Sequence, residues 1–185
     1  MKKILCALSF ALSAAAANAG PLDFYVGGVG GVGNGVMITP RHSAIDHAAH
    51  PAHSFGAVAG IDIPVFRVEA EYNYMTTDAV NLHAAMINGY VKFLPTPIVK
   101  PYVGLGIGKV VAGELDGGDK VKKSGAGQGM LGLQFGVPTL PLFIDLEGRI
   151  FGANKIWATT VPLSSDEKSV GFLQYDIRAK LRYIF

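Results

Sequence analysis

Residues 66–75 alternate strictly between apolar and polar or charged side chains, and this pattern restricts the fold more than any other feature. Successive side chains of a β-strand point to opposite faces, so the pattern predicts a strand with one apolar and one charged face. A helix would mix the two sets around its circumference. The apolar set is Phe66, Val68, Ala70, Tyr72 and Tyr74, and the polar set is Arg67, Glu69, Glu71 and Asn73.

Two segments nearer the C-terminus, residues 142–151 and 175–185, repeat the alternation. Their charged sets are Asp145, Glu147 and Arg149 in the first, and Asp176, Arg178, Lys180 and Arg182 in the second. Five other segments show the pattern less completely: residues 24–32, 54–63, 84–94, 100–111 and 125–137. The sequence therefore predicts eight strands of about ten residues, a length that suits a tilted membrane-spanning strand.

No apolar run of about 18 residues follows residue 19, so no membrane-spanning helix is expected beyond it. A membrane protein without such a helix has to be a closed β-barrel, in which backbone polar groups pair between strands. The alternative is a soluble periplasmic β-protein, and the connections between the expected strands separate these two interpretations.

Three connections are short and contain proline, which ends a hydrogen-bonded ladder because it has no N–H to donate. They are residues 63–65, 95–97 and 138–141. The other four are mostly longer and more polar, and comprise residues 33–53, 76–83, 112–124 and 152–168. Short turns at one end and longer loops at the other are typical of outer-membrane barrels. We therefore predict an all-β fold, an eight-stranded antiparallel transmembrane β-barrel with the topology of an up-and-down meander.

The N-terminal segment has the features of a cleavable signal peptide. Lys2 and Lys3 precede an apolar stretch over residues 4–17, and Ala17-Asn18-Ala19 fits the small-x-small cleavage pattern. We therefore expect residues 1–19 to be removed and residues 20–185 to form the barrel domain. Cys6, the only cysteine, is expected to leave with the signal peptide, so the mature chain would have no thiol chemistry.

Three stretches resemble a known family: residues 99–104 at a strand start, residues 145–149, and the terminal Tyr183-Ile184-Phe185. They are similar to the opacity-type family of small outer-membrane barrels, which is related in design to the OmpA and OmpX barrels. The resemblance implies the fold and an integral location in a bacterial outer membrane. It also implies that Phe185, with Tyr183 before it, is the recognition signal for the barrel-assembly machinery. Functions within the family reside in variable loops, so the resemblance implies none for this chain.

Charged side chains on the inward faces raise two interpretations, an ion pathway or catalytic carboxylate pair, and a structural salt-bridge network. An eight-stranded barrel has an interior only wide enough for side chains. Both signs of charge are present, so buried charges can pair. We favour the network, with members Arg67, Glu69, Glu71, Asp145, Glu147, Arg149, Asp176 and Arg178, accompanied by Lys92, Lys180 and Arg182.

Four histidines fall in the first expected loop, and His47, His50 and His53 are spaced by three. Imidazoles so close in sequence are candidates for binding Zn, Cu or Ni. A closed metal site needs fixed ligands, whereas this loop is rich in alanine and is expected to be mobile. We therefore expect no metal and no cofactor, and a polar, pH-sensitive loop instead. The glycine runs in residues 27–35 and 104–109 lack the spacing of a phosphate-binding loop, and we interpret them as glycines that permit bends or tight packing.

An enzyme that modifies lipid A is the most specific catalytic alternative, because some eight-stranded outer-membrane barrels are deacylases or acyltransferases. Such a deacylase resembles a serine hydrolase with a His-x-Ser arrangement on a strand, and this sequence has none. His53 and Ser54 are adjacent, and adjacent residues of a strand point to opposite faces. We therefore expect no catalytic residues.

Ile156 and Trp157 lie in the last expected loop. They fit two roles equally, anchoring at the membrane interface and contact with a protein or glycan partner. The net charge of +2 is too small to indicate nucleic acid. We expect a non-enzymatic surface protein in contact with outer-membrane lipid, either an adhesin that binds host or extracellular ligands through residues 33–53 and 152–168, or a barrel that stabilises the envelope. A narrow pore and a lipid A-modifying enzyme are the alternatives.

Overall fold

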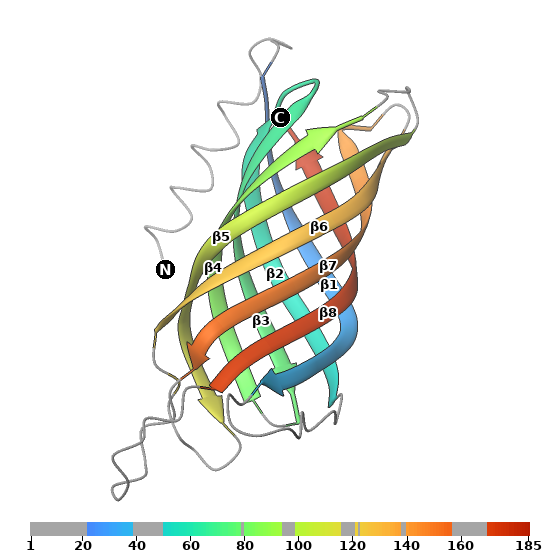
Figure 1. The fold of residues 1–185 in the computed structure, drawn as a ribbon. Coiled ribbons are helices and arrows are strands. Elements are labelled where there is room, and N and C mark those ends of the chain that lie inside the picture. Colours follow the sequence, from blue (N-terminus) through green and yellow to red (C-terminus); the bar gives the residue numbers. More distant parts are fainter. Residues whose placement is uncertain are drawn as a thin grey trace, which may run out of the picture.

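The computed structural model describes residues 22–38, 50–78, 80–93, 99–115, 121, 123–137, 140–156 and 170–185. In these residues the chain forms eight strands that close into one antiparallel barrel, because β8 pairs with β1 (Figure 1). The strands are β1 (Asp23–Ile38), β2 (His50–Asp62), β3 (Phe66–Thr77), β4 (Val80–Lys92), β5 (Val99–Leu115), β6 (Ser124–Gly136), β7 (Leu142–Ile156) and β8 (Val170–Ile184). The predicted all-β meander is therefore confirmed. No described segment is a helix long and apolar enough to cross a membrane.

The two ends of the barrel differ in their connections. One end, which we call the turn end, carries the short connections 63–65, 93–98 and 137–141 and the C-terminus. The opposite end, at the bottom of Figure 1, we call the loop end. It carries the connections 39–49, 116–123 and 157–169, together with a tight connection of residues 78–79. The expectation of a loop over residues 76–83 was wrong, since most of that segment belongs to β3 and β4.

The strands are longer than the sequence predicted, and they extend at the loop end. β5 has 17 residues and β1 has 16, whereas a tilted strand crosses a bilayer with about 9–11. Residues 33–38, 50–53, 112–115 and 152–156, expected in loops, are therefore strand residues. The extra length places the loop-end rim beyond the apolar layer that a membrane provides.

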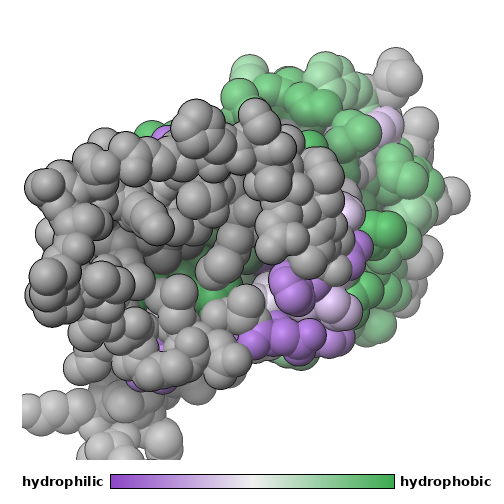
Figure 2. Space-filling view, turned by 60° about the horizontal axis from the view of Figure 1, so that its bottom comes forward, coloured by the Kyte–Doolittle hydropathy of each residue, from purple (hydrophilic) through white to green (hydrophobic). Residues whose placement is uncertain are grey.

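The side-chain alternation gives the barrel an apolar outer wall and a polar interior. In β3, Phe66, Val68 and Tyr72 are between 51% and 56% exposed, while Arg67 and Glu69 are fully buried. Figure 2, which brings the loop end forward, shows a hydrophobic wall with hydrophilic residues where the wall approaches that end. This arrangement, apolar outside and polar inside, is that of a transmembrane barrel.

Inward-facing glycines of β5 make room for larger side chains of β4. The register pairs Gly104 with Tyr90, Gly106 with Asn88, and Gly108 with Met86. A Cβ on Gly106 would collide with the Asn88 side chain and would lie 2.9 Å from Cγ of Gln128. The expected tight packing at these glycines is therefore present in the interior.

We predict that Gly106→Val lowers the free energy of unfolding by about 1–3 kcal/mol, because extra atoms in a filled interior force neighbouring side chains to move. Gly89→Val is the matched control, since a Cβ at this outward glycine of β4 meets nothing within 4 Å. Urea titration in detergent micelles, followed by circular dichroism, measures both. Equal stability of the two variants would show that the interior has free space beside Asn88.

Candidate functional site

The barrel interior holds a dense set of buried charges. Among the described residues, six acidic and six basic side chains are buried, each no more than 6% exposed. The acids are Asp62, Glu69, Glu71, Asp145, Glu147 and Asp176, and the bases are Arg67, Lys92, Arg149, Arg178, Lys180 and Arg182. We call these twelve residues the interior network. It contains all the inward charges that the sequence indicated, and also Asp62, which sequence analysis missed because its strand carries no other charge.

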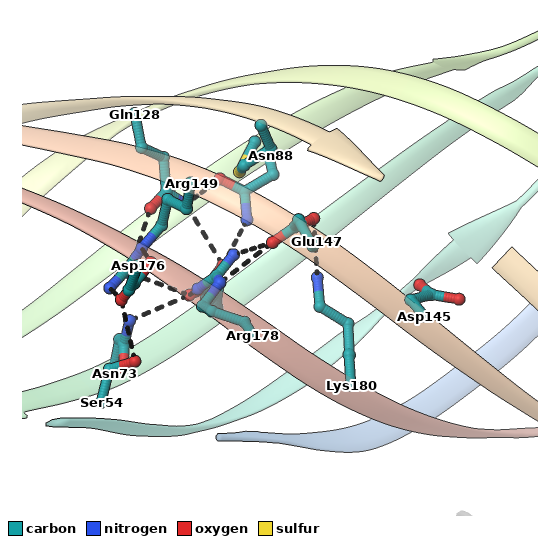
Figure 3. A network of polar contacts seen from close by, with 12 residues as sticks. Ser54, Asn73, Asn88, Gln128, Asp145, Glu147, Arg149, Asp176, Arg178 and Lys180 are labelled. Atoms are coloured by element: carbon teal, nitrogen blue, oxygen red, sulfur yellow. Dashed lines mark hydrogen bonds and ion pairs between the residues drawn. The ribbon is translucent and has the colours of Figure 1, made fainter. Parts of the chain in front are cut away.

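Arg178 of β8 lies at the centre of the interior network, between carboxylates from β3 and β7 (Figure 3). Its Nη1 is 2.5 Å from Oε1 of Glu71, and its Nε donates to Oε1 of Glu147 at 3.0 Å. The side-chain amides of Asn88 and Gln128 donate to Oε2 of Glu71 at 2.7 and 3.2 Å. Both oxygens of Glu71 therefore have partners.

Asp176 of β8 is the second carboxylate with several donors (Figure 3). Nε of Arg149 donates to its Oδ1 at 2.9 Å, and Nη2 of Arg149 donates to its Oδ2. Ser54 and Gln174 also donate to Oδ2, at 3.0 and 2.8 Å. Three side chains from three strands thus make four hydrogen bonds to one carboxylate, which fixes the position of β8 relative to β2 and β7.

Asp145 and Asp62 form the part of the network nearer the turn end. Arg67 donates to Oδ2 of Asp145 at 2.7 Å, and Arg182 donates to both oxygens of Asp145 at 2.9 and 3.0 Å. The same guanidinium of Arg182 donates to Asp62 at 3.1 Å, and Lys92 is also paired with Asp62. Arg182 therefore bridges two carboxylates that come from different strands.

Tyrosines complete the network around Glu69. Lys180 lies 2.7 Å from Oε1 of Glu69, and the hydroxyls of Tyr25 and Tyr90 donate to its two oxygens at 2.7 and 2.8 Å. The guanidinium of Arg67 lies 3.9 Å from the ring centroid of Tyr90. Since Nε and Nη2 of Arg67 have no hydrogen-bond partner among the residues that the structure describes, the ring face supplies part of the stabilisation that hydrogen bonds would give.

The chemistry of this arrangement favours a structural role. A buried charge is costly unless it is paired and hydrogen-bonded. The network has equal numbers of acids and bases among the described residues, and each of its carboxylates has a basic or hydrogen-bonding partner in the interior. A carboxylate that acted on a substrate would need an accessible face, and these carboxylates are no more than 5% exposed.

At the loop end the interior changes from charged to apolar. A cluster of side chains, each no more than 8% exposed, fills this part of the barrel. Its members are Met75, Val80, Leu82, Ala84, Met86, Val110, Val121, Phe151, Ala153 and Phe172. We call this cluster the loop-end plug. Sequence analysis did not identify it, although extending the alternation beyond the charged positions of β3 and β7 places Met75 and Phe151 on the inward face.

The outer face becomes polar at the same level. Thr76 and Asn81 are paired outward residues of β3 and β4, and Thr76 Oγ1 donates to Asn81 Oδ1 at 2.5 Å. Outward His53 lies opposite Thr76 on the other side. The polarity of the two faces is therefore reversed at the loop end, with apolar residues inside and polar residues outside, as expected of a barrel segment that projects into water.

Two of the histidines proposed as metal ligands, His50 and His53, lie on a strand and not in a loop. His50 begins β2 and His53 follows on the same strand, and positions three apart on a strand point to opposite faces. His47 lies outside the described residues. The described part of the chain contains no group of three or more His, Cys, Asp or Glu side chains placed to hold a metal ion.

The serine and histidine positions give no nucleophile–base pair among the described residues. His53 is exposed, whereas the adjacent Ser54 is 1% exposed and donates to Asp176 inside the barrel. His83 lies on the outer wall, where its Nδ1 is 3.0 Å from the Tyr72 hydroxyl and its ring is 4.8 Å from that of Tyr74. The barrel wall therefore separates Ser54 from both imidazoles.

The candidate surface-binding residues lie at the edge of the described structure. Ile156 is the last residue of β7 and pairs with Val170, so its expected loop position was wrong. The expected strand ended at residue 151, whereas the pairing with β8 continues, across an irregularity after Ala153, to Ile156. Trp157 lies outside the described residues.

Tyr183 and Phe185 close the barrel at the turn end. The Phe185 backbone N–H donates to the carbonyl of Phe24 at 2.8 Å, and its ring lies 5.2 Å from that of Tyr183, edge to face. These contacts join the C-terminus to β1. Recognition of Phe185 by the assembly machinery stays a prediction.

We predict that deleting Phe185 reduces insertion into the outer membrane of cells, while the truncated protein still refolds in detergent. One backbone hydrogen bond and one ring contact at an end are a small part of the barrel's stability, whereas a recognition signal is lost completely. Membrane fractionation compared with refolding yield separates the two effects. Equal insertion of the truncated and full-length chains would show that Phe185 is not the recognition signal for assembly.

The fold and the filled interior together define the class. This chain is a small eight-stranded transmembrane β-barrel of the outer-membrane type, with an interior occupied by side chains.

Comparison with solved structures agrees with this class. Neisserial surface protein A has a TM-score of 0.64 and 19% identity, over 88% of this chain and 97% of its own. The outer-membrane protein AlkL has a TM-score of 0.56 and 14% identity, over 92% and 94% of the two chains. The N-terminal barrel domain of Pseudomonas aeruginosa OprF has a TM-score of 0.50 and 12% identity, over 87% and 97%.

At these identities the likeness shows the fold alone. It confirms that the fold resembles that of small outer-membrane barrels. No family model matches the sequence, and a search of the curated proteins finds no match.

Proposed function

We propose that this chain is a non-enzymatic surface protein of a bacterial outer membrane, whose barrel is a rigid scaffold for ligand recognition at the loop end. In this proposal the signal peptide directs export and Phe185 directs insertion. By the general rule for such barrels, the short turns face the periplasm and the loop end faces outward. The observation that carries the proposal is the filled interior, where the network residues are no more than 6% exposed and the plug residues no more than 8%.

The filled interior argues against the alternative of a narrow pore. A hydrated ion moving from the turn end would have to separate Arg178 from Glu71 and Glu147, all 3% exposed or less. It would then meet the loop-end plug, which offers apolar side chains in place of water. Both steps oppose passage, the first by breaking buried ion pairs and the second by desolvation.

The outer wall and the interior are therefore occupied by lipid and by side chains, which leaves the rim for a soluble partner. Recognition concentrates in connections on a rigid scaffold, because these vary without unfolding it. We assign binding to the connections 39–49 and 157–169 with the strand ends beside them. Trp157 and Ile156 are the proposed anchors for a protein or glycan, since large side chains often dominate interface energy. His47 is the proposed pH-sensitive contributor.

A chimera tests this proposal. Residues 39–49 and 157–169 are each replaced by Asp78-Ala79, the chain's own two-residue connection between β3 and β4. The probes are immobilised extracellular-matrix and serum proteins, with binding of the refolded barrel measured by surface plasmon resonance. We expect the chimera to lose binding and to keep its circular dichroism spectrum, and a control with only residues 116–120 replaced to bind normally.

Binding by the chimera equal to that of the native protein would place recognition elsewhere and contradict the assignment. If the native protein binds none of the probes, the recognition part of the proposal fails, and a role in stabilising the envelope takes its place.

A further inference from the structure

A hollow of about 770 Å³ lies on the outside of the barrel, across β5, β6, β7, β8 and β1, on the side that faces the viewer in Figure 1. The outward side chains that line it are between 40% and 77% exposed, whereas the inward residues Met130, Arg149 and Asp176 are buried, so the hollow opens on the outer wall. The outward set is Val32, Val103, Leu105, Leu131, Ile150, Tyr175 and Ile177. We call this hollow the wall groove.

Two outward glycines form the floor of the wall groove. Gly129 of β6 lies between Leu105 and Ile150 in the register, and Gly148 of β7 pairs with Leu131. A Cβ on either glycine would make one ordinary contact at 3.9 Å, in contrast to the collisions at the interior glycines. The fold therefore has room for a side chain at both positions. The groove exists because glycine has no side chain to fill that space.

Positive charge lies beyond the groove, toward the loop end. Along the outer face of β5, Leu105 is followed by Ile107 and then by Lys109, which pairs with Gly125 of β6. Lys123 precedes β6 and, like Lys109, is exposed. Neither lysine has an ion pair with any described residue. Lys109 lies four positions along the strand from Leu105, or about 13 Å, which is comparable to an extended acyl chain of the outer leaflet.

We propose that the wall groove binds an acyl chain of a phosphorylated, multiply acylated lipid of the outer leaflet, with Lys109 and Lys123 holding its phosphate. The proposal rests on the proposed location in an outer membrane with the loop end outward. The apolar groove is continuous with the lipid-facing wall, and the two lysines lie where that wall becomes polar. Lysines at such a level extend their ammonium groups to the headgroup region and attract anionic lipid.

A second copy of the barrel is the other occupant that an apolar outer face could take, and the test below distinguishes it from lipid.

The test uses the mature barrel refolded in lipid-free detergent and titrated with diphosphoryl lipid A, with bound lipid counted by native mass spectrometry. Gly129→Leu fills the groove, and Lys109→Gln with Lys123→Gln removes the charges. We expect each change to weaken binding by about tenfold or more, because the first excludes several methylene contacts and the second removes both phosphate partners. Gly28→Leu is the matched control and is expected to bind normally, because Gly28 is an outward glycine of β1 outside the groove where a Cβ also makes one contact at 3.9 Å.

A dephosphorylated lipid A distinguishes the contribution of the wall groove, which binds the acyl chain, from that of the two lysines, which bind the phosphate. It is expected to bind the native barrel more weakly than the diphosphoryl form, and the lysine variant is expected to bind both forms equally. Binding that is unchanged in Gly129→Leu, or native binding that ignores the phosphates, would overturn the proposal. A native dimer that Gly129→Leu dissociates, without bound lipid, would assign the groove to self-association instead. Because refolded protein in detergent has no membrane orientation, failure here is distinct from failure of the loop chimera.

Discussion

Arg178→Ala is expected to lower the free energy of unfolding by about 3–5 kcal/mol, the cost of leaving buried carboxylates without their partner. Arg178 is 1% exposed and contacts both Glu71 and Glu147, so its removal leaves two carboxylates without a guanidinium that both of them use. Water cannot replace it readily, because the surrounding interior is filled. Urea titration of the refolded barrel in detergent micelles measures the change.

A second variant separates charge from packing in this prediction. Adding Glu147→Gln to Arg178→Ala restores equal numbers of acids and bases in the interior network, and we expect it to recover part of the lost stability. Lys109→Ala is the surface control, since Lys109 is exposed on the outer wall, and it should change stability by less than about 0.5 kcal/mol. A loss for Arg178→Ala as small as that of the control would contradict the pairing.

Phe151→Ala is the second large expected effect, with a loss of about 3–5 kcal/mol from removing a fully buried aromatic ring. Phe151 is fully buried in the loop-end plug, and its ring centroid lies 6.4 Å from that of Phe172. The guanidinium of Arg149 lies 5.6 Å from the same ring, so Phe151 connects the plug to the interior network. The substitution therefore leaves a cavity beside a buried charge.

The neighbouring Ile150 is the matched control for this variant. It points outward and is 61% exposed, so Ile150→Ala removes little that the folded barrel buries. Thermal unfolding, followed by the shift in gel mobility of heated samples, compares the two variants. If Ile150→Ala costs as much as Phe151→Ala, the inward cluster is not a packed core.

The sequence predicted the middle of each strand well, because there the two faces meet opposite environments. Lipid outside and paired charges inside produce the alternation seen at Phe66 and Arg67, or at Ile144 and Asp145. Because faces alternate, one apolar or charged residue assigns the faces of its neighbours. The inward orientation of the charged residues in the interior network was predicted in this way.

The loop-end extensions were not predicted, for a physical reason. Beyond the bilayer the outer face meets water and the inner face packs in the plug, so Met75 points inward while Thr76 points outward. The alternation continues, but the apolar residues now point inward and the polar residues point outward. A prediction that follows apolar residues along the outer face therefore ends the strand too early. The closed topology and the register also depend on pairing between distant strands, such as β1 with β8, which no local pattern determines.

The wall groove was also beyond prediction from the pattern alone. The alternation places Gly129 and Gly148 on the outer face and the glycines at 104 and 106 on the inner face, but it does not show how much space lies over each. Only the register shows that the first pair has open space above it and the second pair does not.

Electrical recording tests the central claim, a barrel whose interior is closed from the turn end to the loop end. The refolded native protein is inserted into a planar lipid bilayer in potassium chloride, with insertion verified by protease protection of the reconstituted barrel. We predict no steady current steps above the lipid baseline at either polarity, because the interior network and the loop-end plug leave no hydrated path. Reproducible steps of constant conductance, present for the folded barrel and absent after heat unfolding, would contradict the closed interior and favour a pore.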